Sequence, residues 1–147
     1  MNTHDTINEL LVHLYNEIWE LEEHAIITEE FKNISNNDMH IIEAIGLGDG
    51  NNMSTIAKKL KITVGSLTTS MNSLVNKKYV MRQRSEEDRR VVYIRLLPKG
   101  ERAFYHHKEF HNQMINAVVD TLGENEVPIL LNTLNRLSEF FRSYKPN

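Results

Sequence analysis

The sequence predicts a mainly α-helical fold with a small β-wing, and three observations lead to this class. Amphipathic patterns at helical spacing occupy both ends of the chain. Two shorter helical segments, joined by only a few residues, lie in the middle. Two β-type runs around a charged loop follow them directly. The expected architecture is a winged helix-turn-helix region between N- and C-terminal helices that form a dimerisation bundle.

The bulk properties exclude several classes of protein. At 147 residues the chain fits a single domain, residues 1–147, with a real core. Without cysteine there can be no disulfide, thiolate zinc site or cysteine nucleophile. The sequence has neither an apolar run near the ~18 residues of a membrane span nor a signal-peptide pattern. We therefore expect a cytoplasmic protein with no membrane partner.

The charge is unevenly distributed. The formal net charge is −3, yet residues 58–102 hold 12 of the 17 Lys and Arg and only four acids. This local excess of eight positive charges between acidic flanks is the asymmetry expected when one face meets a polyanion. The alternative is a solvated charged surface.

The first helix is expected to start at Thr6, because Thr6 and Glu9 have the spacing of a capping box. Apolar residues follow in two stripes, one from Ile7 to Ala25 and one through Val12, Tyr15, Trp19 and Ile26. A helix that is apolar on two sides is wedged between layers, and the second layer is expected to be another subunit.

The middle of the chain carries three further helix starts. Ser35 precedes one helix, and glycines and asparagines of residues 46–52 end it. Asn52 is expected to cap a helix over 53–60, and Thr63 to cap one over 64–76. The inward residues of this last helix are Val64, Leu67, Met71, Leu74 and Val75.

The outward face of the 64–76 helix is small and polar. It carries Gly65, Ser66, Thr68, Thr69, Asn72, Ser73 and Asn76. Small hydroxyl and amide groups let a backbone approach base edges closely and exchange hydrogen bonds with them, which favours helix-turn-helix binding to DNA. The alternative is a helical hairpin whose polar face meets only water.

The charged loop lies within residues 79–97 and holds Arg84, Asp88, Arg89 and Arg90. Such a loop on a hairpin suits a phosphate backbone, so residues 35–100 are expected to bind DNA. Pro98 suits the first turn of the next helix, which Gly123 breaks, and Glu124 is expected to start the last one. The dimerisation helices are then residues 1–31 and 101–147.

This order of elements resembles the MarR family of bacterial transcription regulators over nearly the whole chain. The likeness is most specific at Asp88–Arg90 before the Val91-Val92 strand and at Leu96–Gly100. Within the family, it is closest to the branch that represses fatty-acid biosynthesis genes in Gram-positive bacteria. Residues 64–74, 84–92 and 107–111 carry that narrower match.

The resemblance implies a homodimer on a pseudo-palindromic double-stranded DNA operator, with the 64–76 helix in the major groove and Arg89 and Arg90 in the minor groove. A narrow minor groove attracts arginine, and Asp88 can hold a neighbouring guanidinium in place. The expected DNA-binding residues are Gly65, Ser66, Thr68, Thr69, Asn72, Arg82, Arg84, Asp88, Arg89 and Arg90.

Two residues depart from the family pattern. Lys78 stands where many members have glycine, and a left-handed conformation there would cost roughly 1–2 kcal/mol. Leu97 stands where a threonine usually caps the following helix, a loss of about 1 kcal/mol.

No cofactor is expected, but the resemblance implies an effector: an acyl chain presented by acyl carrier protein, which acts as corepressor. Trp19, Phe104, Phe110 and Met114 are candidate pocket residues, although plain core packing explains any one of them equally well.

A zinc-responsive repressor of metal-uptake genes is the alternative. His107 and His111 lie four residues apart, and His40 with Glu22 or Glu23 would complete a tetrahedral site without cysteine.

Two rival classes remain. An enzyme is disfavoured, because no nucleophile elbow, phosphate-binding glycine loop or H-E-x-x-H motif occurs. A winged helix that contacts only proteins would show no salt-sensitive DNA binding.

Overall fold

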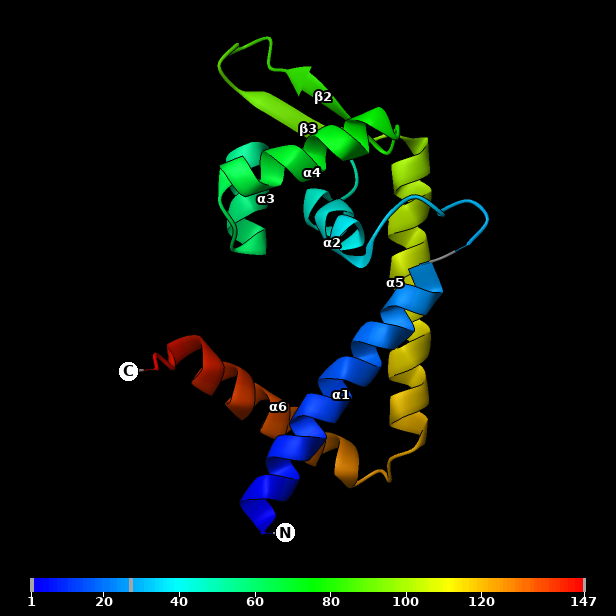
Figure 1. Cartoon of the computed structure of the whole chain (residues 1–147), viewed down its shortest axis with the longest axis vertical. Coiled ribbons are helices and arrows are strands. Elements are labelled where there is room, and N and C mark those ends of the chain that lie inside the picture. Colours follow the sequence, from blue (N-terminus) through cyan, green and yellow to red (C-terminus); the bar gives the residue numbers. More distant parts are fainter. Residues whose placement is uncertain (1, 27, 147) are drawn as a thin grey trace. The chain divides into compact units, whose positions relative to one another are not determined.

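A computed structural model describes residues 2–26 and 28–146 (Figure 1). It confirms the predicted class, because helices predominate and the only sheet in the described residues is a small antiparallel one. The elements are α1 (Thr3–Ile26), α2 (Asn36–Ile45), β1 (Asn51–Asn52), α3 (Met53–Leu60), α4 (Val64–Asn76), β2 (Val80–Arg84), β3 (Val92–Leu96), α5 (Pro98–Asp120) and α6 (Glu126–Ser143).

The chain forms two compact units. The first runs to Phe110 and contains α1, the helix-turn-helix, the sheet and the first part of α5. The second begins at His111 and contains the rest of α5 and all of α6.

Three of the predicted helix starts are confirmed by their capping bonds. Ser35 and Asp38 form a reciprocal capping box at α2. The side chain of Asn52 accepts from the amide of Thr55 at 2.8 Å, and Thr63 accepts from the amide of Ser66 at 3.1 Å. Each cap satisfies an amide that has no partner within its own helix.

Two predicted helix starts are wrong. α1 begins at Thr3 and not at Thr6, because the side chain of Asn2 accepts from the amide of Asp5 at 2.9 Å. Thr6 lies inside the helix, where its hydroxyl donates to the carbonyl of Asn2. α6 begins at Glu126, two residues after Glu124, and the Glu126 carboxylate accepts from the amide of Gly123 at 2.9 Å.

The sheet has the order β1-β3-β2, and both pairings are antiparallel. The sequence predicted the β2–β3 hairpin but not β1, which pairs Asn51 with Ile94. Gly50 makes this pairing possible: it has a φ of +76°, and a Cβ there would lie 1.8 Å from the carbonyl oxygen of Ile94. Glycine is the residue that tolerates both conditions.

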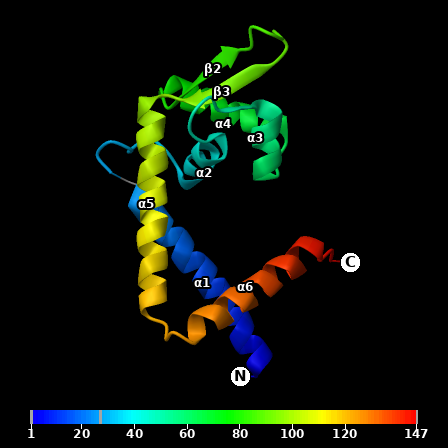
Figure 2. The same ribbon diagram turned by 180° about the vertical axis from the view of Figure 1, so that it is seen from behind.

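The core of the first unit lies between α2, α3, α4 and the sheet, which both views show grouped together (Figures 1 and 2). From α4 it takes Leu67, Met71 and Leu74, each with no exposed surface, while Val75 is partly buried. Val64, expected to face inward, is instead 43% exposed. It is the first residue of α4, where the helix projects beyond the core.

The passage from α4 to β2 is tightly built. Lys78 has a φ of +66°, so the left-handed conformation expected for glycine at this position is present. Tyr79 is fully buried, and its hydroxyl donates to the side chain of Asn33 at 2.8 Å. Burial, together with the nearby carboxylates of Glu30 and Asp38, raises the pKa of Tyr79 above its usual value.

The start of α5 lies directly on this passage. The amide of Leu97 donates to the carbonyl of Tyr79 at 2.9 Å, and a Cβ on Gly100 would lie 2.2 Å from the same oxygen. Leu97 offers no side-chain cap. The backbone contact with Tyr79 therefore anchors the entry to α5.

Each unit exposes a large apolar surface. In the first unit it lies on α1 and comprises Ile7, Leu10, Leu11, Val12, Leu14, Tyr15, Ile18, Trp19 and Leu21. In the second it comprises Ile115, Val118, Val119, Ile129, Leu131, Leu134, Phe140, Phe141 and Tyr144. Across the described residues, no helix combines the length and apolar character needed to cross a membrane.

The contact at Gly100 gives a direct test of this packing. Gly100→Ala should lower the free energy of unfolding by about 1–3 kcal/mol, because the added methyl meets backbone that cannot move aside. Gly65→Ala is the matched control: its Cβ meets nothing closer than 3.9 Å, so it should leave stability unchanged or raise it by up to about 1 kcal/mol. Urea unfolding measures both, and equal stability of the two variants would contradict the close contact.

Candidate nucleic-acid interface

The outward face of α4 is exposed as predicted at Gly65, Ser66, Thr68, Thr69, Asn72 and Asn76, whereas Ser73 is half-buried. Two of its hydroxyl groups already have partners. The Thr63 hydroxyl donates to that of Ser66 at 2.9 Å, and the Thr68 hydroxyl donates to the carbonyl of Val64 at 2.8 Å. Thr68 thus offers a base edge its methyl group and an acceptor oxygen.

Asn72 is joined to the wing. Its side-chain oxygen accepts a hydrogen bond from the guanidinium of Arg82, which lies on β2. Both residues are exposed, so the bond lies at the surface where α4 and β2 meet. Among the residues predicted to bind DNA, this bond links the helix directly to the hairpin.

The loop between β2 and β3 is organised around Asp88. Its carboxylate accepts from Nε and Nη2 of Arg90, both at 3.1 Å, and from the backbone amide of Arg90 at 3.0 Å. These hydrogen bonds hold the pKa of Asp88 below its usual value. A two-pronged contact of this kind fixes a guanidinium in both position and plane.

The two neighbouring arginines are placed differently. Arg84 donates to the backbone carbonyl of Arg89 at 3.1 Å and so closes the loop. The Arg89 side chain itself is exposed. The sequence therefore places three arginines in one loop, but the structure gives Arg84 a bracing bond and Arg90 a fixed pose.

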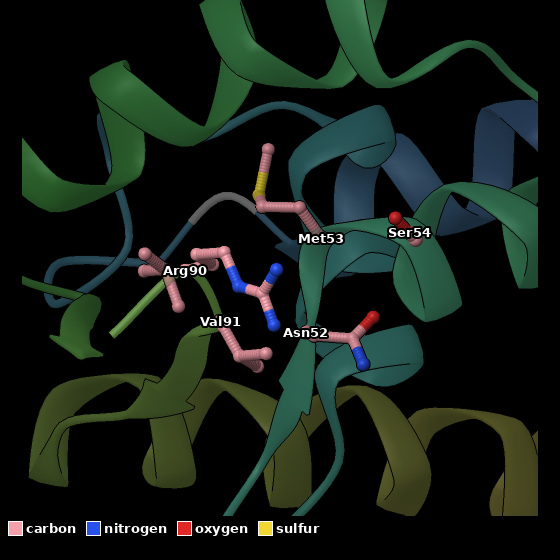
Figure 3. Close-up of a pocket in the computed structure, with 6 residues that line it drawn as sticks. Asn52, Met53, Ser54, Arg90 and Val91 are labelled. Carbon is pink, nitrogen blue, oxygen red and sulfur yellow. The ribbon is translucent and has the colours of Figure 1, made fainter. Parts of the chain in front are cut away.

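A hollow of about 360 Å³ separates the wing from the start of α3. It is lined by Asn52, Met53, Ser54, Arg90, Val91 and Val92. Figure 3 shows Arg90 and Val91 facing Asn52 and Met53 across this space. The Arg90 side chain therefore extends from the wing loop toward the start of α3.

A separate group of histidines and carboxylates lies between α1, α2 and α5 in the first unit. His40 Nε2 lies 3.5 Å from Glu22 Oε2, and His107 Nδ1 lies 3.5 Å from Glu43 Oε2. The rings of His40 and His107 meet edge to face at 5.6 Å, and Glu22 and His107 are buried. His111 follows His107 by one helical turn on α5.

The sequence leaves open whether Glu22 or Glu23 belongs to the histidine group, and the structure places Glu22 there. Glu22 points to His40 and accepts from Asn36 at 2.9 Å. Glu23 is exposed and accepts from the indole of Trp19 at 2.9 Å. Sequence reasoning missed Asn36 and Glu43; the spacing of Glu43, three residues after His40, was the available signal.

The residues expected to line an acyl-chain pocket have varied surroundings. Trp19 is 38% exposed and stacks on Tyr15, with ring centroids 6.5 Å apart. Phe104 packs against the core of the first unit. Phe110 and Met114 are half-buried on α5.

Comparison with known proteins gives consistent results. Residues 25–106 match the family model described as transcriptional regulator SarA/Rot. FabT of Streptococcus pneumoniae, solved in complex with DNA, is 37% identical with a TM-score of 0.91, and the match covers 97% of this chain and 99% of FabT. The uncharacterised HTH-type regulator YpoP of Bacillus subtilis is 24% identical over 108 residues, 74% of this chain and 77% of that protein.

A more distant structure shows the same fold. MepR of S. aureus, also solved in complex with DNA, is 21% identical with a TM-score of 0.72, and the match covers 95% of this chain and 98% of MepR.

The ion pair between Asp88 and Arg90 leads to a prediction for the titration of the Asp88 carboxyl. In an NMR pH series the carboxyl of Asp88 should have a pKa below its ordinary 3.8, and Arg90→Ala should return it toward that value. Because the pKa is lowered in the folded protein, the stabilisation from this pairing is present above the ordinary pKa of 3.8 and is lost as the pH falls through the folded pKa. Arg89→Ala is the control and should leave this titration unchanged; an ordinary pKa in the native protein would contradict the pairing.

Proposed function

Since this chain belongs to the MarR-type family of winged-helix transcriptional regulators, we propose that it acts as a homodimeric repressor of fatty-acid biosynthesis genes. Its relatives and its fold are those of regulators and not of enzymes, and DNA is its partner. Beyond DNA binding, we propose which genes it represses, which effector it binds and which residues contact the DNA.

One observation carries the DNA contacts: a small, exposed polar face on α4 stands beside a wing whose Asp88 fixes the pose of Arg90. α4 enters the major groove through Gly65, Ser66, Thr68, Thr69 and Asn72. Arg89 and Arg90 enter the minor groove, and Arg84 braces the loop that carries them through its bond to the carbonyl of Arg89. The excess of positive charge in residues 58–102 supports this orientation.

The apolar surface of α1 supports the dimer. It carries Ile7, Leu14 and Ile18 with 43–54% exposure, and contiguous apolar surface of this kind marks a protein interface. A second copy of the chain covers it. The two α4 helices then lie about 34–36 Å apart, as a pseudo-palindromic operator requires.

The resemblance in residues 64–74, 84–92 and 107–111, together with 37% identity to FabT over nearly the whole chain, supports a role in fatty-acid regulation. The effector is an acyl chain on acyl carrier protein, which acts as corepressor. It binds beside Phe104 and Phe110 and favours the conformer whose wings match the operator, since a ligand shifts an equilibrium only through unequal affinity for the two states.

Zinc is a second candidate effector, and the group around His107 favours it. Tetrahedral zinc with bonds near 2.1 Å places its ligand atoms roughly 3.4 Å apart. The 3.5 Å between His40 Nε2 and Glu22 Oε2 fits this spacing, and ligand atoms of Glu22 and His107 lie within 4.8 Å of each other. His40, Glu22 and His107 of the first unit would hold the ion, which would link α1, α2 and the first part of α5.

The wing makes a testable contribution to DNA binding. Replacing Arg89 and Arg90 together by alanine should weaken binding at least about tenfold and reduce the slope of log affinity against log salt by about 4, since the dimer loses two charges from each of its two wings and these no longer displace counterions. Fluorescence anisotropy over a salt series measures both.

The control variant combines Lys32→Ala with Lys108→Ala. It also removes two positive charges per chain, but from exposed residues outside the proposed DNA face. Dimer mass and melting temperature should stay unchanged in both double variants. Equal affinities of the wing variant and the native protein would refute the assignment of the wing.

The effector is identified by native mass spectrometry and elemental analysis of protein purified without chelator. An acyl species bound to the dimer is the expected result, whereas stoichiometric zinc would replace the lipid assignment by the metal one. In that event Glu22→Gln should lower zinc affinity by about 10–100-fold or more, while Glu23→Gln should not, because only Glu22 faces His40.

A further inference from the structure

The bond between Arg82 and Asn72 connects two parts of the protein that are expected to read different grooves. Arg82 lies on strand β2 of the wing, and Asn72 lies on the exposed face of α4, one turn after Thr68. They are ten residues apart in the chain. A hydrogen bond at this place can control how the helix presents the carboxamide of Asn72 on that face.

Strand geometry places Arg82 toward α4. Residues two apart on a strand share a face, so Arg82 points the same way as Val80, which is buried in the core. Its partner in the register is Ile94, which is also fully buried. The Arg82 side chain therefore lies on the inner face of the sheet, just outside the core and beside the exposed side of α4.

The chemistry of arginine fixes the orientation of the Asn72 amide. A guanidinium has five N–H donors and no acceptor, so the atom of Asn72 that faces it must be the carbonyl oxygen. The amino group of the same carboxamide then points away from Arg82. Asn72 is therefore held with its amino group directed away from Arg82 and with one of the two lone pairs of its oxygen in use.

This orientation matters for base recognition. In the major groove an asparagine reads adenine with both of its groups, accepting from N6 and donating to N7. Guanine and thymine present keto oxygens, which need only a donor. An asparagine whose oxygen is turned toward Arg82 presents mainly its donor group, which favours the keto bases over the two-group pairing with adenine.

We propose that Arg82 is a positioning residue that fixes Asn72 as a hydrogen-bond donor to a keto base, guanine or thymine, in each half of the operator. The proposal rests on the function proposed above, in which α4 enters the major groove. It reassigns Arg82 from a direct DNA contact to a residue that acts through Asn72.

Removal of Arg82 should change how Asn72 reads its base. With Arg82→Ala the carboxamide of Asn72 is free to rotate and to use both of its groups, so adenine becomes acceptable at the position it reads. A correct base contact contributes discrimination of roughly 5- to 150-fold. That preference for a keto base should fall toward unity or turn toward adenine in the variant, while the other positions keep their preferences.

The experiment uses the full-length protein and duplexes that the native protein selects from a randomised DNA library. Binding is then measured for every single base-pair replacement in one half-site, for the native protein and for Arg82→Ala, Arg82→Lys, Asn72→Ala and the double alanine variant. Melting temperature is recorded for each. Because both residues are exposed, the variants are expected to fold.

The supporting result is a change in base preference that is confined to one position of the half-site. Asn72→Ala should abolish the keto preference there, and Arg82→Ala should relax it or turn it toward adenine. Arg82→Lys, which keeps a donor beside Asn72, should retain it. Once Asn72 is alanine, further loss of Arg82 should not alter the profile.

Three outcomes overturn the inference. Arg82→Ala lowers affinity equally for all duplexes and reduces the salt slope, as a phosphate contact would; Asn72→Ala leaves the base preferences unchanged; or Arg82→Lys behaves like Arg82→Ala. Each leaves the proposed function standing. If instead the native protein selects no sequence and binds all duplexes alike, the proposed function itself fails.

Discussion

The burial of one side of α4 against the sheet is the constraint on which the rest of the structure depends. Leu67, Met71 and Leu74 lose all contact with water, at a gain of about 1.5–3 kcal/mol for each side chain. Successive residues of a helix differ by about 100° in direction, so burial of these three fixes the rotation of α4 and turns Thr68, Thr69 and Asn72 outward. The face proposed to read DNA is thus set by the packing behind it.

The wing depends on the same packing. Val80, Ile94 and Leu96 complete the core from the sheet, and the strand that carries Val80 also carries Arg82. The backbone contact of Gly100 with Tyr79 then brings α5 onto the end of that strand. A few apolar residues therefore position the helix, the hairpin and the first part of α5, while polar contacts such as Asp88 with Arg90 adjust individual side chains at the surface.

Local chemistry was predictable from the sequence, and contacts between distant segments were not. The caps at Ser35, Asn52 and Thr63 involve residues three apart, which a sequence displays directly. Thr6 was misleading because Asn2 offers a competing cap one turn earlier. Strand β1 and the bond from Arg82 to Asn72 depend on tertiary packing, so no local pattern indicates them. The predicted dimer, acyl-chain pocket and individual DNA contacts stay predictions, because they concern partners that a single chain does not contain.

The small residues on the outer face of α4 also have a consequence for conformational entropy. Long charged side chains lose about 1.5–2 kcal/mol of rotamer freedom each when they are immobilised, whereas glycine loses none and serine and threonine lose little. Ser66 and Thr68 already have hydrogen-bonded hydroxyls before any DNA arrives. A helix built in this way enters the groove with its side chains largely ordered, so little of the favourable contact energy is offset by ordering them.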